Sequence, residues 1–138
     1  MLKKMIIFPC CLLFVISVYS FNNNPLFSRY AEKFEIYLLN ASSTAQIVQV
    51  SEKEFKSFKG IKGESCKIKD EEFSIKKFFS EFNATIIFEE KTNFGISYYG
   101  FSPTIKYKKE IHNKIINLHV FVGESEITVG SPIIFGSF

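Results

Sequence analysis

Two histidines, His112 and His119, are the first candidates in this sequence for metal binding or acid–base chemistry. A protein zinc site normally takes three or four ligands at characteristic spacings. His112 lies in a segment typical of a turn, and His119 shares a predicted strand face with Asn117 and Ile115. No zinc-ligand spacing, phosphate-binding loop, Gly-x-Ser-x-Gly elbow or His-Glu-x-x-His helix is present. We therefore expect ordinary turn and strand histidines, and we assign no catalytic, cofactor-binding or metal-binding residue.

Adjacent carboxylates are the second candidates, because two carboxyl groups at a suitable distance form an acid–base couple. Glu89 and Glu90 are neighbours in a predicted strand, where successive side chains point to opposite faces of the sheet. These two groups therefore cannot act on one substrate atom together. Glu71 and Glu72 fall in the first turn of a predicted helix, where anions are favourable. Both pairs are expected at a solvated surface.

The third candidate is Cys66, because the other two cysteines, Cys10 and Cys11, lie in an apolar leader. A single cysteine cannot form a disulfide within the mature domain. A nucleophilic thiol needs a partner that stabilises the thiolate, and the sequence shows no base beside Cys66. The sequence therefore predicts an ordinary, partly exposed thiol.

Aromatic and basic residues occur together in one stretch, which superficially resembles a nucleic-acid platform: Tyr98, Tyr99, Phe101, Lys106, Lys108 and Lys109. In a strand, however, Tyr99 and Phe101 share one face and Tyr98 the other, which favours packing. The whole chain has a net charge of +3. Without Lys3 and Lys4 it has 15 basic against 14 acidic residues, which is a net charge of +1. A nucleic-acid partner usually requires a basic stripe, so nucleic acid is an unfavourable prediction.

The N-terminus has the pattern of a secretory leader. Lys3 and Lys4 precede the uncharged run 5–18, whose 14 residues match the apolar core of a signal peptide. A spanning helix needs about 20 residues, which the run 5–21 approaches if it stays uncleaved. We therefore interpret residues 1–20 as a signal peptide, cleaved after Ser20, or a membrane anchor. Either reading predicts a protein outside the cytoplasm, secreted or held at the membrane.

After the leader, the hydrophobic pattern predicts a linker over 21–32 and one α+β domain over 33–138. With 138 residues and 46% hydrophobic composition, the chain suits a single packed domain. Apolar residues at Ile75, Phe78, Phe79 and Phe82 line one face of a predicted helix over 70–82. Asp70 is its expected N-cap and Asn83 its left-handed end.

Alternating residues elsewhere indicate strands joined by short connections, which makes neighbouring strands antiparallel. The predicted strands cover 33–40, 45–50, 85–90, 95–102, 104–111, 115–122, 126–130 and 133–135, whereas 51–66 has no clear pattern. The expected fold is an antiparallel meander whose one main helix covers one face.

Asn-Leu-His-Val-Phe-Val at 117–122 and Glu-Ile-Thr-Val-Gly-Ser-Pro-Ile-Ile at 126–134 resemble the ending of YwmB-type proteins, and residues 82–84 and 96–103 fit the same pattern. The resemblance covers residues 74–138 well and 34–40 weakly. It implies a fold like a single repeat of the TATA-box-binding saddle, usually behind a signal peptide, in spore-forming Gram-positive bacteria. The chain departs from the family in being shorter and in carrying His119 where Gln is usual.

We expect, from the leader and the missing catalytic motifs, a non-catalytic cell-envelope domain that needs no cofactor. Its open sheet face would bind an envelope protein or wall component. The alternatives are an envelope enzyme acting on wall polymers and, less favoured, DNA binding through the saddle. A single repeat also leaves a sheet edge exposed, so two copies could pair as a homodimer.

Overall fold

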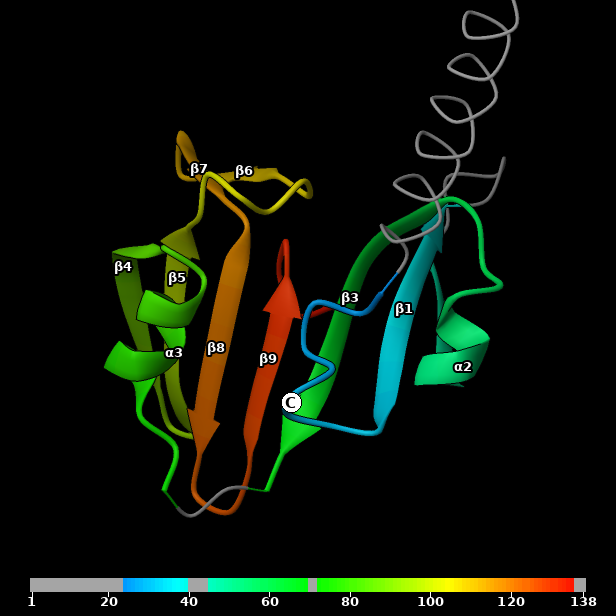
Figure 1. Ribbon diagram of the computed structural model, residues 1–138. Helices are drawn as coiled ribbons and strands as arrows, with labels where there is room; N and C mark the ends of the chain where they lie inside the picture. Colours follow the sequence, from blue (N-terminus) through cyan, green and yellow to red (C-terminus); the bar gives the residue numbers. More distant parts are fainter. Residues whose placement is uncertain (1–23, 40–44, 70–71, 136–138) are drawn as a thin grey trace, which may run out of the picture.

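A computed structural model describes residues 24–39, 45–69 and 72–135 (Figure 1). The leader predicted over 1–20 lies outside these residues. No helix in the described part of the chain is long and apolar enough to cross a membrane.

Seven strands form one antiparallel sheet in the order β2-β1-β3-β9-β8-β5-β4. Their bounds are β1 Lys33–Leu39, β2 Ala45–Ser51, β3 Ile61–Ile68, β4 Thr85–Thr92, β5 Gly95–Phe101, β8 Leu118–Gly123 and β9 Ile127–Ser131. The prediction of an α+β fold on an antiparallel sheet is therefore confirmed. Strands β4, β5, β8 and β9 are consecutive neighbours, as a meander requires, and β3 joins the N-terminal strands to the same sheet.

Helix α3 spans Ile75–Glu81 and packs on one face of the sheet (Figure 1). Its N-cap is Ser74, whose hydroxyl accepts a hydrogen bond from the Lys77 amide, so the helix begins later than the sequence predicts. The predicted apolar side of the helix is confirmed, because Phe78 and Phe79 are buried. Asn83 follows the helix with φ 51°, which is the left-handed ending expected for it.

The stretch without a clear pattern contains the short helix α2, Glu52–Phe55, and strand β3. Ser51 and Glu54 form a capping box at the start of α2, in which each side chain bonds the other residue's amide. Phe55 is buried and lies edge-on to Phe34, with ring centroids 6.3 Å apart. A charged helix of one turn and a strand containing Gly63 give little periodic signal. This explains why no element could be predicted from the sequence in this region.

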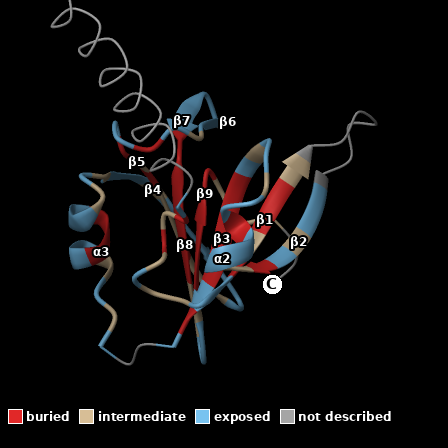
Figure 2. Ribbon diagram, turned by 45° about the vertical axis from the view of Figure 1, so that its right-hand side comes forward, coloured by how far each residue is buried: buried red, intermediate tan, exposed pale blue. Residues whose placement is uncertain are grey.

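Residues 24–32, predicted as a linker, pack against the domain. Phe27 is completely buried and stacks on Phe78 of α3 at a centroid distance of 6.0 Å. In Figure 2 the buried segments, in red, lie mainly on the central strands β3, β9 and β8 and on the side of α3 that faces the sheet. The segment packs there because Phe27 fills space between α3 and the sheet, which its polar neighbours in the sequence do not reveal.

The region after β5 also differs from the prediction. The predicted strand 104–111 is a strand only at β6, Lys109–Ile111, which pairs with β7, Lys114–Ile116, in a separate two-stranded sheet. The predicted strand 115–122 is divided between β7 and β8. The division falls at Asn117, whose side chain bonds the backbone of the preceding loop at Ser102 and Ile105.

Candidate functional site

One face of the sheet carries the main core, and the opposite face is buried in its middle and exposed toward the edge strands β2 and β4. The covered face carries Phe34 and Ile36 of β1, which belong to one core cluster with Phe27, Phe55 and Phe78. Alternate residues point to the opposite side. The strand register places six of these in one row across the sheet: Glu35, Ser65, Gly130, His119, Tyr99 and Phe88. We call this side the open face.

Three aromatic rings on the open face form a continuous stack. Phe88 lies parallel to Tyr99, with centroids 4.5 Å and planes 19° apart. Tyr99 in turn stacks on the imidazole of His119 at 4.2 Å and 18°. The three residues come from β4, β5 and β8, where they are direct cross-strand partners. The stack therefore ties three strands together, with His119 buried and the rings of Tyr99 and Phe88 half-buried.

His119 is held by hydrogen bonds on both ring nitrogens. Nδ1 accepts from the Ile134 amide at 3.1 Å, so Nε2 carries the proton in the neutral ring. Nε2 lies 3.0 Å from Ser97 Oγ and therefore donates to it. Burial lowers the pKa of His119 to about 4. An imidazole that already directs its proton at the serine cannot take the serine's proton, so this pair is not a nucleophile and its general base.

The three residues after cis-Pro132 form a strap on the open face. The Ile134 amide bonds His119, and the Phe135 amide donates to the Tyr37 hydroxyl at 3.1 Å. The Phe135 ring lies edge-on to Tyr37, with centroids 4.4 Å apart. Tyr37 also donates to Ser65 Oγ at 2.7 Å, and burial raises its pKa. The strap therefore covers the middle of the face and forms one wall of a groove.

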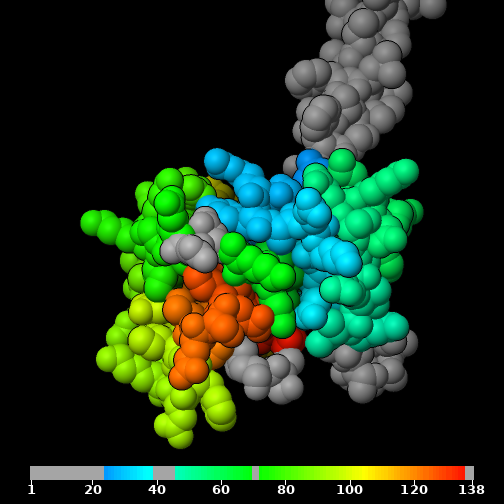
Figure 3. Space-filling model, turned by 90° about the horizontal axis from the view of Figure 1, so that it is seen from below, coloured from blue at the N-terminus to red at the C-terminus, as the bar shows by residue number. Residues whose placement is uncertain are grey.

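The groove has a volume of about 480 Å³ and lies between the strap and the turns at the far end of the sheet. Figure 3 looks onto this end, where the yellow-green β4–β5 hairpin projects beside the orange β8–β9 turn. Apolar and polar side chains share the lining of the groove, and Phe94 at the β4–β5 turn is 73% exposed. Three carboxylates line the groove: Glu35, Glu124 and Glu126. Lys67 also lines it and bonds Glu126 at 3.1 Å, so the lining has an excess of negative charge.

Lysines of the β6–β7 region border the opposite end of the open face. Lys114 Nζ lies 5.7 Å from the centroid of the Phe88 ring, and Lys109 Nζ lies 5.6 Å from that of Phe135. Both distances fall within the range of a cation–π contact. His112, in the β6–β7 turn, lies 3.6 Å from Glu90. The open face is therefore basic along one end and acidic along the other.

The carboxyl group with the most unusual environment is Glu64 of β3. Its side chain is buried and accepts a hydrogen bond from the Leu26 amide. Burial raises its pKa to about 7, against the opposing effects of the Leu26 and Phe27 amides. Burial likewise raises the pKa of the Tyr107 hydroxyl, and the negative charge of Glu64 raises it further. Sequence reasoning missed Glu64 because a single Glu in an irregular strand gives no sign of burial.

The other candidates from the sequence do not form a common site. Cys66 is buried rather than partly exposed, and burial raises its pKa to about 12. It is therefore a core thiol and a poor nucleophile. Glu89 and Glu90 are exposed on opposite faces of β4, as predicted. Tyr98 packs against the core.

Within the described residues, no group of three or more His, Cys, Asp or Glu side chains could hold a metal ion. Comparisons with protein-family models, curated proteins and solved structures give no significant match to this chain. The candidate site therefore stands on its own geometry. It consists of the aromatic stack and the adjoining groove of the open face.

Proposed function

We propose that this protein is a non-catalytic domain of the cell envelope that binds a protein or wall component through the groove of its open face. The observation that carries the proposal is the exposure of Phe94 in a groove whose lining combines apolar and acidic side chains. A large apolar side chain at a concave surface favours a bound partner over water. The acidic rim at Glu124 and Glu126 further favours a partner that presents basic or hydroxyl groups.

Binding is favoured over catalysis because the polar groups of the aromatic stack are already used to hold the fold. The proton of the His119 imidazole is directed at Ser97, and its other nitrogen accepts from the backbone. Tyr99 bonds Glu90 at 3.4 Å. A catalytic acid or base must be free to exchange a proton with substrate.

The extracytoplasmic location is part of this proposal and rests on the leader sequence. Fractionation of the host followed by intact-mass analysis tests it. A species that begins near Phe21 outside the membrane, or a full-length species in the membrane, supports the proposed location. A full-length soluble species in the cytoplasm contradicts it.

The proposed binding face is tested by site-specific photo-crosslinking in envelope preparations. A photoreactive phenylalanine analogue at Phe94 or Ile47 lies in the groove, and the same analogue at Lys77 lies on the outer side of α3. We expect adducts to an envelope component from the two groove positions only. Equal yields from all three positions, or no adduct from the groove, would exclude the groove as the binding site.

We also propose, from the resemblance at 117–134, that the domain is a YwmB-like relative of the TATA-box-binding fold. The support is a helix packed on an antiparallel sheet, whose last two strands in the chain, β8 and β9, carry most of the resembling residues. An experimental structure of a YwmB-type protein provides the test. Superposition of its strands on β4, β5, β8 and β9 in the same order supports the relationship, and a different strand order rules it out.

A further inference from the structure

Strand β4 ends the sheet and has a strand partner on one side only within the described residues. It is eight residues long, Thr85–Thr92, and pairs with β5 alone. Seven of its eight residues are exposed, and only Phe88 is half-buried. The outward backbone groups of such a strand are a ready template for another strand. Proteins usually shorten, cover or charge an edge of this length.

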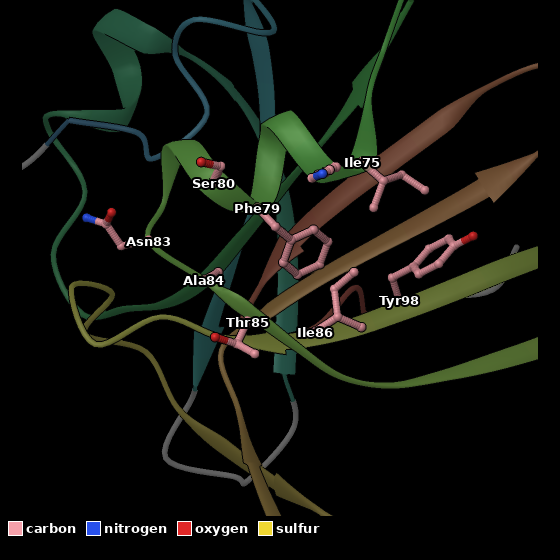
Figure 4. Close-up of a pocket in the computed structure, with 9 residues that line it drawn as sticks. Ile75, Phe79, Ser80, Asn83, Ala84, Thr85, Ile86 and Tyr98 are labelled. Carbon is pink, nitrogen blue, oxygen red and sulfur yellow. The ribbon is translucent and has the colours of Figure 1, made fainter.

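Apolar residues are concentrated at this edge. Five large hydrophobic side chains are exposed in the described part of the chain, and three of them lie on β4 or the turn that follows it: Ile86, Ile87 and Phe94. Ile86 also borders an open groove of about 740 Å³ between α3 and β4 (Figure 4). In Figure 4 its side chain lies beside those of Phe79 and Tyr98. A strand added at this edge would cover apolar surface as well as backbone.

The charges of β4 are arranged for pairing with an identical strand. The register with β5 places Glu89 and Lys91 on the α3 side of the sheet and Glu90 on the open face. A two-fold axis perpendicular to the sheet at Glu90 would set Glu89 of each copy opposite Lys91 of the other. Opposite charges at directly paired positions stabilise antiparallel strands. Registers centred on Glu89 or Lys91 would instead bring like charges together on that side.

We propose that two copies of this chain form a homodimer by antiparallel pairing of their β4 strands, centred on Glu90. The two sheets would then continue into one, and the contact would be the same patch on both copies. The two Glu90 carboxylates approach each other at the axis. His112 of each copy lies 3.6 Å from its own Glu90 and supplies positive charge there when protonated. The proposal shares Phe94 with the groove proposed for partner binding, but it rests on the pairing of β4 and not on that groove.

Sedimentation equilibrium of the full chain in density-matched non-ionic detergent tests the dimer. We expect a dimer for the unchanged protein. Glu89→Lys and Lys91→Glu should each weaken dimerisation at least tenfold, because each places like charges opposite each other twice. The double variant E89K/K91E restores the opposite-charge pairs and should restore the dimer. Circular dichroism confirms that the variants fold, which their exposed positions favour.

Mixing the two single variants gives the sharpest test. E89K carries two positive charges at these positions and K91E two negative charges, so the mixture should form heterodimers. Glu52→Lys and Lys53→Glu reverse exposed charges on α2, which packs against β1 and β2 toward the other edge of the sheet, and should leave the dimer unchanged. A monomer at micromolar concentration overturns the proposal. A dimer that is as strong in both single variants as in the unchanged protein also overturns it. That result is expected if the copies associate through the N-terminal leader or through β2.

Discussion

The imidazole of His119 lies parallel to the ring of Tyr99, with 4.2 Å between their centroids. The histidine is 2% exposed, although it stands on the open face, because the strap at 133–135 passes over this part of the sheet. It is therefore a buried, neutral ring that joins the aromatic stack to the C-terminal strap. Its protonation would add a charge where burial disfavours one and would remove the acceptor for the Ile134 amide.

Replacing His119 should change how stability depends on pH. Its folded pKa of about 4 lies below its ordinary value of 6.5, so the unfolded chain binds more protons between these values. His119 should therefore lower stability as pH falls from about 6.5 to about 4, by a total of about 3 kcal/mol. Urea unfolding from pH 8 to 4 should show that His119→Gln removes this contribution. His112→Gln, at the exposed turn, should retain it; equal profiles for the two variants would contradict the assignment.

Glu64 should make stability depend on pH in the opposite direction. Its folded pKa of about 7 lies above its ordinary value of 4.5, so the folded chain binds more protons between these values. Stability should therefore fall as pH rises from about 4.5 through 7, because the buried carboxylate must ionise. Glu64→Gln keeps an oxygen for the Leu26 amide and should stabilise the protein at pH 8 by up to about 3 kcal/mol.

The exposed Glu81 is a less suitable control for Glu64, because it bonds Tyr30. Glu52→Gln, at the exposed start of α2, is better matched. Unfolding in urea should show that Glu64→Gln raises the free energy of unfolding at pH 8, and that this increase is smaller at pH 5. A loss of stability at pH 8 would mean that the carboxylate is stabilising there.

The sequence predicted the elements whose side chains follow one clear period. Ile75, Phe78 and Phe79 mark the inward side of α3, and alternation identifies β4 and β5. Their burial is decided by local spacing alone, so a single sequence carries the information. The start of α3 was placed too early because Asp70 and Ser74 are both good N-caps, and the choice between them depends on packing.

The candidate site was harder to predict because it depends on contacts between distant segments. Glu64 is buried by residues 24–27, which are far away in the sequence. The stack of Phe88, Tyr99 and His119 requires the register of three strands, and the β6–β7 insertion hides the pairing of β5 with β8. The face was predicted to be open, but the strap covers its middle, and the groove beside the strap depends on the same path of the chain.

Cys66 should resist thiol reagents while the domain is folded. Its side chain is 4% exposed, and burial raises its pKa to about 12, so almost no thiolate is present at pH 8. Brief iodoacetamide treatment at pH 8 followed by peptide mass mapping distinguishes it from Cys10 and Cys11. We expect no label on Cys66 in buffer. In about 6 M guanidinium, which unfolds most domains, we expect complete labelling. Labelling at equal rates in the two conditions would contradict the buried position.

Among the polar residues where the open face meets the β6–β7 hairpin, Asn117 should cause the largest loss of stability when it is replaced. It is completely buried, and its Oδ1 accepts from the Ser102 amide at 2.7 Å. Its Nδ2 donates to the carbonyls of Ser102 at 2.6 Å and Ile105 at 3.2 Å. Asn117→Ala leaves these three backbone groups without their partner and should cost about 3 kcal/mol or more.

Asn117→Asp separates the roles of the two side-chain atoms. A carboxylate still accepts from Ser102 but cannot donate to either carbonyl, so it should destabilise as strongly as Ala at pH 8. Asn93→Ala, in the exposed β4–β5 turn, should change stability by less than about 0.5 kcal/mol. Hydrogen exchange should show faster exchange of the amides between 102 and 116 in both Asn117 variants. Unchanged exchange there would mean that the hairpin is held by its other contacts, and that Asn117 does not set the boundary between β7 and β8.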